Sequence, residues 1–230
     1  MPTSLLASAT PIERWSLANA ASVLAATAGA WTRGSVWPIV LVGGTLLVGL
    51  AVVAHGRWTP QGHFGRANAV TALRAGLLGL LPVADPAGLI ALSLVILTTD
   101  GLDGWLARRG DLESEFGAFF DKETDALFLL LLCGLAAVDD RLPVWILGAG
   151  LLRYVFVPLL FLLPAPKKTE ERSSGARYVY TAMVLALLTA FLPYPDLYEP
   201  LVALASGALV LSFARSLWRI VPRRQPFGER

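Results

Sequence analysis

The run LFLLLLCGLAAV, residues 127–138, decides the fold class of this chain. It is continuously apolar, which is typical of a membrane helix and not of the alternating strands of a transmembrane barrel. Several further apolar runs approach or exceed the roughly 20 residues that a helix needs to cross about 30 Å of hydrocarbon. Hydrophobic residues make up 55% of the chain, charged residues make up 16%, and the mean hydropathy is +0.61. The sequence therefore predicts an all-α fold, a polytopic membrane helical bundle.

Proline, glycine and charged residues divide the apolar runs into eight expected helices. Their ranges are 16–32, 36–55, 67–83, 86–107, 115–138, 142–163, 175–194 and 198–220. For the first range a signal peptide is the alternative, because Arg14 precedes its apolar part and small residues follow it. If both termini are cytoplasmic, most of the 19 lysines and arginines fall in cytoplasmic segments. We therefore expect a multi-pass protein of the cell inner membrane.

Four aspartates lie close together among these apolar segments. They are Asp100, Asp103, Asp121 and Asp125. Spacings of three and four residues place each pair on one face of a helix. The polar stretch between the pairs predicts a turn, so the two helices should be antiparallel with their acidic faces opposed. On the expected topology this cluster faces the cytoplasm.

A positive partner is needed for these carboxylates, because a charge at mid-bilayer costs about 2.5–3.5 kcal/mol on insertion scales and like charges repel. Lys122 adjoins Asp121 but points about 100° away around the helix, so it is a poor sole counterion. Carboxylate oxygens suit Mg²⁺ or Mn²⁺, and four of them can hold two ions. Paired ions of this kind act on the attacking and leaving oxygens of a phosphoryl displacement.

The four aspartates belong to a longer pattern, which reads Asp100-x2-Asp103-Gly104-x2-Ala107-Arg108-x8-Gly117-x3-Asp121-x3-Asp125. It resembles the signature of the class I CDP-alcohol phosphotransferases, with every fixed position filled. The stretch NAVTALR, residues 68–74, resembles the N-x2-T-x2-R of that family's first helix. The stretch SSGARYVYT, residues 173–181, resembles a later segment where Gly-Lys-x-x-Thr is often seen, but here Ala176 and Arg177 follow Gly175. The resemblance covers roughly residues 64–220.

The resemblance implies a transferase that moves a phosphatidyl or phospho-alcohol group from a CDP-linked donor to a hydroxyl acceptor and releases CMP. We favour CDP-diacylglycerol as the donor, in phospholipid biosynthesis. The implied ligands of the two Mg²⁺ or Mn²⁺ ions are Asp100, Asp103, Asp121 and Asp125, and Asp125 is also the implied general base. The implied CDP-binding residues are Asn68, Thr71, Gly104, Ala107, Arg108 and Gly117.

Two arginines are candidates for binding the acceptor, Arg153 and Arg177. Arg153 is ten residues into the apolar run PVWILGAGLLRYVFVPLLFLLP, so it needs a partner within the membrane. That partner is an acceptor phosphate, an aspartate or, alternatively, a backbone carbonyl. Arg177 lies in the segment where the spacing departs from the family, which leaves the identity of the acceptor open.

The expected organisation is an N-terminal membrane extension of about two helices, residues 1–63, followed by a phosphotransferase domain of six helices, residues 64–230. Membrane lipids are expected partners, and the extra helices are a hypothesis for homodimer contacts. No nucleic-acid binding is expected, because the basic residues lack interleaved aromatics. The alternative function is a cation-coupled transporter or channel, which would place acids along a continuous path on several helices. A catalytically silent relative is a third option, against which the intact aspartates count.

Overall fold

The computed structural model describes the backbone of residues 10–109, 114–162 and 174–220, and the side chains of residues 10–100, 114–159 and 175–218. Over these ranges it contains helices and no strand, so the all-α prediction is confirmed. The helices are α2 (Pro11–Arg33), α3 (Trp37–Val53), α4 (Arg66–Leu78), the short 3-10 helix η1 (Leu81–Val83), α5 (Pro86–Arg109), α6 (Glu115–Val138), α7 (Ile146–Leu162), α8 (Ser174–Thr189) and α9 (Pro195–Ile220). Each of the eight expected ranges overlaps one observed α-helix.

Local sequence explains where the helices begin and end. At the start of α2 the Thr10 hydroxyl accepts from the Glu13 amide at 3.2 Å, and the Glu13 carboxylate accepts from the Thr10 amide at 2.7 Å. This reciprocal cap satisfies two amides that have no partner within the helix. The helix ends at Gly34, whose φ of 58° is left-handed and suits glycine. The hydroxyl of Ser114 caps α6 by accepting from the Gly117 amide at 3.0 Å.

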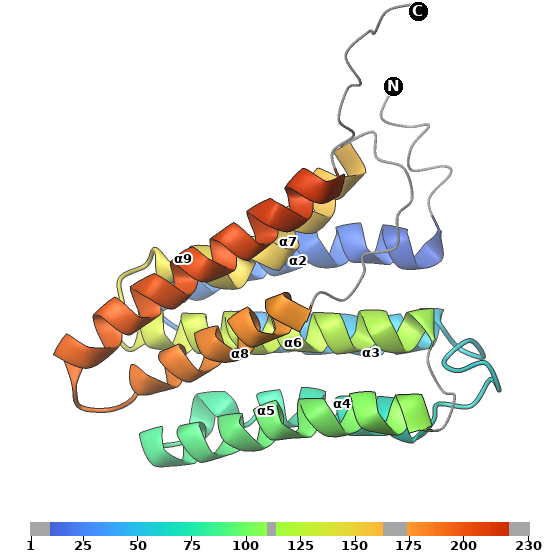
Figure 1. Cartoon of the computed structure of the whole chain (residues 1–230), viewed down its shortest axis with the longest axis horizontal. Coiled ribbons are helices and arrows are strands. Elements are labelled where there is room, and N and C mark those ends of the chain that lie inside the picture. The colour runs from blue at the N-terminus through green and yellow to red at the C-terminus, as the bar shows by residue number, and fades with distance from the viewer. Residues whose placement is uncertain (1–9, 110–113, 163–173, 221–230) are drawn as a thin grey trace, which may run out of the picture.

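Helix α6 forms the centre of the bundle, with contacts to α2, α3, α4, α7 and α8 (Figure 1). Residues 126–137 of α6 are all buried. Two glycines permit close approach of the neighbouring helices: a Cβ on Gly43 of α3 would lie 2.5 Å from a methyl group of Leu127, and a Cβ on Gly150 of α7 would lie 2.9 Å from the Cα of Leu130. The side chains of α6 are therefore positioned by protein on several sides.

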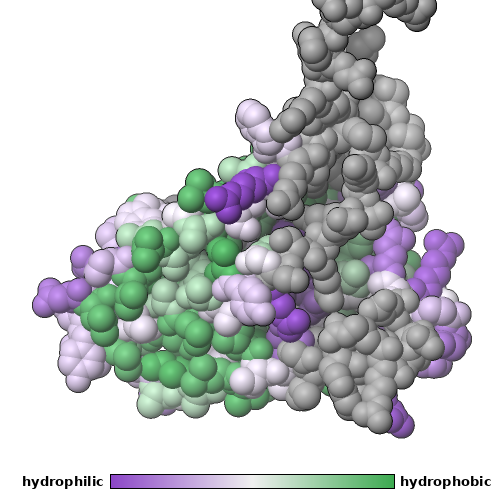
Figure 2. Space-filling model, in the orientation of Figure 1, coloured by the Kyte–Doolittle hydropathy of each residue, from purple (hydrophilic) through white to green (hydrophobic). Residues whose placement is uncertain are grey.

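The other helices form pairs around α6. Helix α4 packs against α5, α2 against α3, and α8 against α9, while α2 and α9 both contact α7 (Figure 1). The N-terminal helices α2 and α3 thus lie directly on the central helices. Apolar side chains are spread over much of the face that Figure 2 shows, with polar side chains at both of its ends and near its middle.

One helix in the described part of the chain, over Pro195–Trp218, is long and apolar enough to cross a membrane. The apolar helical segments Trp37–Val53, Pro86–Asp100, Ile146–Leu159 and Gly175–Thr189 are shorter. Large apolar side chains of α9 are exposed, among them Leu204, Leu211 and Trp218. The polytopic arrangement remains a prediction.

Candidate metal centre and active site

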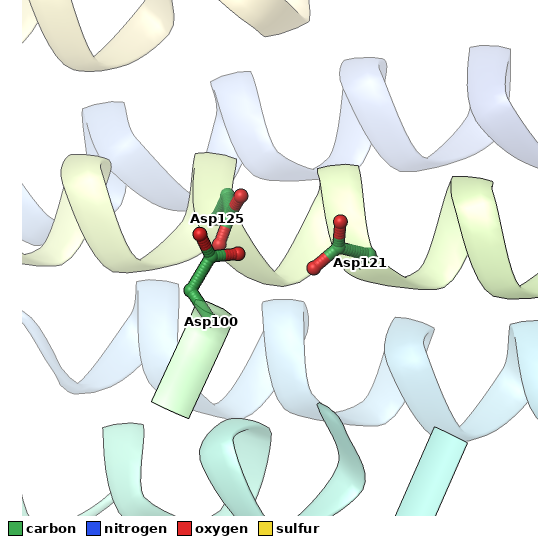
Figure 3. Close-up of side chains that lie close together, drawn as sticks. All are labelled: Asp100, Asp121 and Asp125. Carbon is green, nitrogen blue, oxygen red and sulfur yellow. The ribbon is translucent and has the colours of Figure 1, made fainter. Parts of the chain in front are cut away.

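Three of the four aspartates converge in space. Asp100 comes from α5, and Asp121 and Asp125 lie one turn apart on α6 (Figure 3). One carboxylate oxygen from each lies within 4.8 Å of the other two. The three carboxylates are partly buried, with side-chain exposures of 14–23%. The structure therefore places Asp100 of α5 against the acidic face of α6, and the side chain of Asp103 lies outside its described part.

Arg74 of α4 is the cation that meets this cluster. Its Nη1 lies 3.0 Å from Oδ1 of Asp121 and 3.4 Å from Oδ1 of Asp100, and its Nη2 donates to Oδ1 of Asp125. Arg74 is 1% exposed. A guanidinium has five donors in a planar fork, so it can bridge several carboxylates at once. Arg74 belongs to the stretch NAVTALR, and the structure places its guanidinium among the three aspartates.

The chemistry of these donors fits a divalent metal ion. Every ligand atom in the cluster is a carboxylate oxygen, the donor that Mg²⁺ and Mn²⁺ prefer. The guanidinium of Arg74 lies where the carboxylates meet, which shows that the local field favours a cation there. The geometry and the donor chemistry of Asp100, Asp121 and Asp125 therefore both fit a divalent metal ion.

Helix α8 completes one side of the cluster. Nη2 of Arg177 lies 2.9 Å from Oδ2 of Asp100, and the Arg177 side chain is 54% exposed. The Tyr180 hydroxyl donates to the backbone carbonyl of Asp125 at 3.1 Å. Arg177, an expected acceptor-binding residue, thus lies beside the three aspartates with about half of its side chain exposed.

Three expected CDP-binding residues lie near the starts of two helices: Asn68 and Thr71 belong to α4, and Gly117 belongs to α6. The Asn68 amide donates to the carbonyls of Trp58 and Phe64 at 3.1 Å and 2.6 Å. A Cβ on Gly117 would lie 2.9 Å from Oδ1 of Asn68, so these two residues are in close contact. The Thr71 hydroxyl donates to the carbonyl of Ala67 at 3.3 Å. These contacts anchor the start of α4, and a role for the three residues in binding CDP remains a prediction.

Four further expected site residues have side chains outside the described part of the structure. They are Asp103, Gly104, Ala107 and Arg108. Their backbone belongs to the last turns of α5, directly after Asp100. Their expected roles as metal ligand or CDP-binding residues therefore remain predictions.

Arg153 pairs with Glu123, a residue that the sequence did not suggest as its partner. Its Nη2 and Nε lie 2.8 Å and 3.2 Å from Oε1 of Glu123, so the pair involves neither an aspartate nor a backbone carbonyl. Glu123 is two residues from both Asp121 and Asp125, which places it about 160° around α6 from each of them. Sequence reasoning missed Glu123, although a glutamate beside a long apolar run was the available signal. The structure thus places Arg153 on the side of α6 away from the three aspartates.

Comparison with known proteins identifies the family. Residues 67–218 match the family model of CDP-alcohol phosphatidyltransferases, so the chain belongs to this family. It is also similar to a "Probable cardiolipin synthase (CMP-forming)" of Drosophila melanogaster, at 33% identity over 97 residues. That alignment covers 40% of this chain and 30% of the relative, so the chain spans about a third of the relative's length. No solved structure matches the chain. Membership in a family of transferases favours an enzyme over a transporter or channel.

Proposed function

We propose that this chain transfers a phosphatidyl group from CDP-diacylglycerol to a hydroxyl acceptor and releases CMP. The observation that carries the proposal is the convergence of Asp100, Asp121 and Asp125 within 4.8 Å, in a chain of the CDP-alcohol phosphatidyltransferase family. The name of the similar insect protein supports the release of CMP and a lipid product. The resulting activity is a step of phospholipid synthesis.

The three converging aspartates, with Asp103 as a fourth ligand, would hold two Mg²⁺ or Mn²⁺ ions. When bound, such ions supply charge neutralisation for the diphosphate of the donor and for the oxygen that leaves with CMP. Arg74 would then share the carboxylates with the metal ions, because its guanidinium is held among the same oxygens.

Asp125 is the proposed general base. The oxygen of the acceptor hydroxyl attacks the phosphorus that carries the diacylglycerol, and the bond from this phosphorus to the bridging oxygen breaks. The electron pair of that bond leaves with CMP, and the proton of the hydroxyl passes to a carboxylate oxygen of Asp125. Among the three described aspartates Asp125 has the most exposed side chain, at 23% against 15% and 14%, which supports access by an acceptor. The hydrogen bond from Tyr180 to its carbonyl holds this turn of α6 in place.

The surrounding residues are assigned to substrate binding. Arg177 is proposed to bind an anionic part of the acceptor, because it is half-exposed beside Asp100. The proposed CDP-binding residues are Asn68, Thr71, Gly104, Ala107, Arg108 and Gly117. Of these, Asn68 and Gly117 lie against each other one to two turns along their helices from Arg74 and Asp121. That spacing leaves the nucleotide near the end of the bundle where α4 and α6 begin.

We also propose a multi-pass protein of the cell inner membrane, with its active site toward the cytoplasm. The long apolar helix α9, with exposed side chains such as Leu204 and Leu211, supports contact with lipid. A lipid donor would enter from such surroundings. Residues 1–63 are proposed as an extension to the phosphotransferase domain of residues 64–230.

The test is CMP release from radiolabelled CDP-diacylglycerol by the purified full chain. Each acceptor in a panel is supplied separately: glycerol phosphate, inositol phosphate, serine and a diacylglycerol. Asp125→Asn is expected to lower the rate by about 10²- to 10⁴-fold, as for loss of a general base, and chelation of divalent ions is expected to abolish activity. Asp139→Asn is the matched control, because Asp139 is half-exposed at the far end of α6. CMP release that persists after both chelation and Asp125→Asn would refute the proposal.

A further inference from the structure

Glu123 is a buried carboxylate on the helix that carries two of the proposed metal ligands. It is 2% exposed, and both of its oxygens are engaged. Oε1 accepts from Nη2 and Nε of Arg153 at 2.8 Å and 3.2 Å, and Oε2 accepts from the side-chain amide of Asn19 at 2.8 Å. Burial of a carboxylate is costly unless its oxygens are hydrogen-bonded, so these contacts decide which orientation of Glu123 is stable.

The network joins three helices that are distant in sequence. Asn19 comes from α2, Glu123 from α6 and Arg153 from α7. Asn19 is itself 4% exposed, so the contact to α2 is an interior one. It also lies outside residues 67–218, the part of the chain that matches the family model. The N-terminal helix therefore reaches the central helix of the family domain through a buried polar contact.

Rotation of α6 about its axis is the motion that this network opposes. Glu123 lies about 160° around the helix from Asp121 and Asp125, so Asn19 and Arg153 hold α6 from the side opposite the metal cluster. A carboxylate extends about 5–6 Å from the helix axis, and a rotation of about 20° would therefore move it by about 2 Å. Mg²⁺ requires oxygen ligands near 2.0–2.1 Å in almost ideal octahedral geometry, so such a shift would disrupt the site.

An apolar side chain at position 123 would fill the same space without fixing one rotation. Packing alone tolerates small adjustments, whereas hydrogen bonds on both carboxylate oxygens are lost when donor and acceptor separate by about 1 Å. Replacement of buried ion pairs by apolar residues is often neutral or stabilising, and fixing register is the best-attested use of such pairs. Stability alone therefore does not account for Glu123.

We propose that Glu123, held by Asn19 and Arg153, is a positioning residue that sets the rotation of α6 and so aligns Asp121 and Asp125 for metal binding. Helix α2 accordingly contributes to metal binding, because it supplies Asn19. This inference rests on the proposed function of the aspartate cluster. It gives the N-terminal extension a role in the chemistry, separate from any role in dimer contacts.

The test measures Mn²⁺ binding by electron paramagnetic resonance on the purified full chain, with no substrate present. Asn19→Leu removes the donor to Glu123 and is expected to weaken Mn²⁺ binding by about 10- to 100-fold, the usual effect of losing support for a metal ligand. Thr27→Val is the matched control on the same helix, because the buried Thr27 hydroxyl donates to the Val23 carbonyl of α2 itself at 2.8 Å. The control is expected to leave Mn²⁺ binding unchanged.

A charge-conserving exchange keeps the test informative if Asn19→Leu does not fold. Glu123→Gln alone removes the charge that pairs with the Arg153 guanidinium, and Asn19→Asp alone brings a carboxylate against Glu123, so each single variant should bind Mn²⁺ more weakly. The double variant Asn19→Asp with Glu123→Gln reverses the direction of that hydrogen bond, retains an oxygen for Arg153 and should restore binding. If Glu123 had only a structural role, the single variants would lower the melting temperature and the double variant would restore it, while all three would bind Mn²⁺ as tightly as the wild type.

The outcomes separate this inference from the proposed function. Wild-type chain that binds no Mn²⁺, or binds it equally well after Asp121→Asn with Asp125→Asn, would refute the metal site itself. The metal site stands if the wild type binds Mn²⁺ and the Asp121→Asn, Asp125→Asn variant does not. In that case, the positioning role of Glu123 is wrong if folded Asn19→Leu, Glu123→Gln and Asn19→Asp each bind Mn²⁺ as tightly as the wild type.

Discussion

Replacement of Arg74 by leucine should make the stability of this protein depend on divalent metal. In the structure the Arg74 guanidinium contacts Asp100, Asp121 and Asp125, and the side chain is almost completely buried. Arg74→Leu would leave these carboxylates facing one another without that cation. Mutual repulsion should then destabilise the packing of α4 and α5 on α6 until another cation takes its place.

The magnitude follows from the contact distances. At 3.0 Å and 3.4 Å, with an effective dielectric constant of about 20, each contact corresponds to about 5 kcal/mol of Coulomb attraction before desolvation is subtracted. Removing one partner of a buried ion pair costs about 3–5 kcal/mol, which is about 6–20 °C in melting temperature for a chain of this size. Metal at about 100 times its dissociation constant would restore about 2.7 kcal/mol.

The assay is thermal unfolding of the purified chain in chelator and across a Mg²⁺ titration. Arg74→Leu should melt well below the wild type in chelator and should recover more with Mg²⁺ than the wild type gains. Arg141→Leu is the control, since Arg141 donates to the carbonyl of Ala190 at 3.2 Å and follows the C-terminal end of α6, which ends at Val138. Its loss of stability should not respond to metal. An Arg74→Leu protein whose melting temperature is the same in chelator and in Mg²⁺ would show that the carboxylates do not attract a common cation.

Two further predictions use other contacts. Gly150→Ala should lower the melting temperature by the equivalent of about 1–3 kcal/mol, because the new Cβ would lie 2.9 Å from the Cα of Leu130. Gly148→Ala on the same helix is the control, because its new Cβ would meet nothing within 4 Å, and it should be neutral or slightly stabilising. Equal effects of the two substitutions on the melting temperature would contradict the packing of α7 on α6. Arg177→Ala should change stability by less than about 1 kcal/mol, since its pair with Asp100 is exposed, yet raise the KM for an anionic acceptor in the CMP-release assay. An unchanged KM would remove Arg177 from acceptor binding.

Helix positions could be predicted from the sequence because apolar runs and their interruptions determine them. The range 115–138 agrees with α6 at both ends. The range 67–83 was too long, because α4 ends at Leu78 and the chain continues into a 3-10 turn at Leu81–Val83. Pro82 lies inside that turn and cannot donate the backbone hydrogen bond that would continue an α-helix. Local chemistry therefore explains both the agreement and the difference.

The site could be predicted as far as the two helices that carry the aspartates, because the short turn between them brings Asp100 toward Asp121 and Asp125. Asp121 and Asp125 are four residues apart, so their common face follows from helix geometry alone. The position of Arg74 among them depends on how α4 packs against α6, and no local pattern contains that information. Glu123 illustrates the same limit, because its partners Asn19 and Arg153 are 104 and 30 residues away in sequence. Contacts with helices other than α5 and α6 were the part that sequence reasoning could not supply.

The distance of the site from the ends of its helices follows from helix geometry and packing. Asp125 lies about 15 Å along α6 from its start, Asp100 about 14 Å from the end of α5, and Arg74 about 12 Å from the start of α4, at 1.5 Å per residue. The contact between Asn68 and Gly117 shows that α4 and α6 begin at the same end of the bundle. Three charged groups from three helices therefore lie at about the same distance from this end of the bundle. Beyond them, toward the C-terminal end of α6, residues 126–137 are apolar and buried. A donor with a polar nucleotide and apolar chains matches this division, since its diphosphate would lie at the level of the aspartates with the nucleotide toward the helix ends. Its chains would then extend along the apolar exterior, and the depth of the aspartates would fix where the bond to CMP breaks.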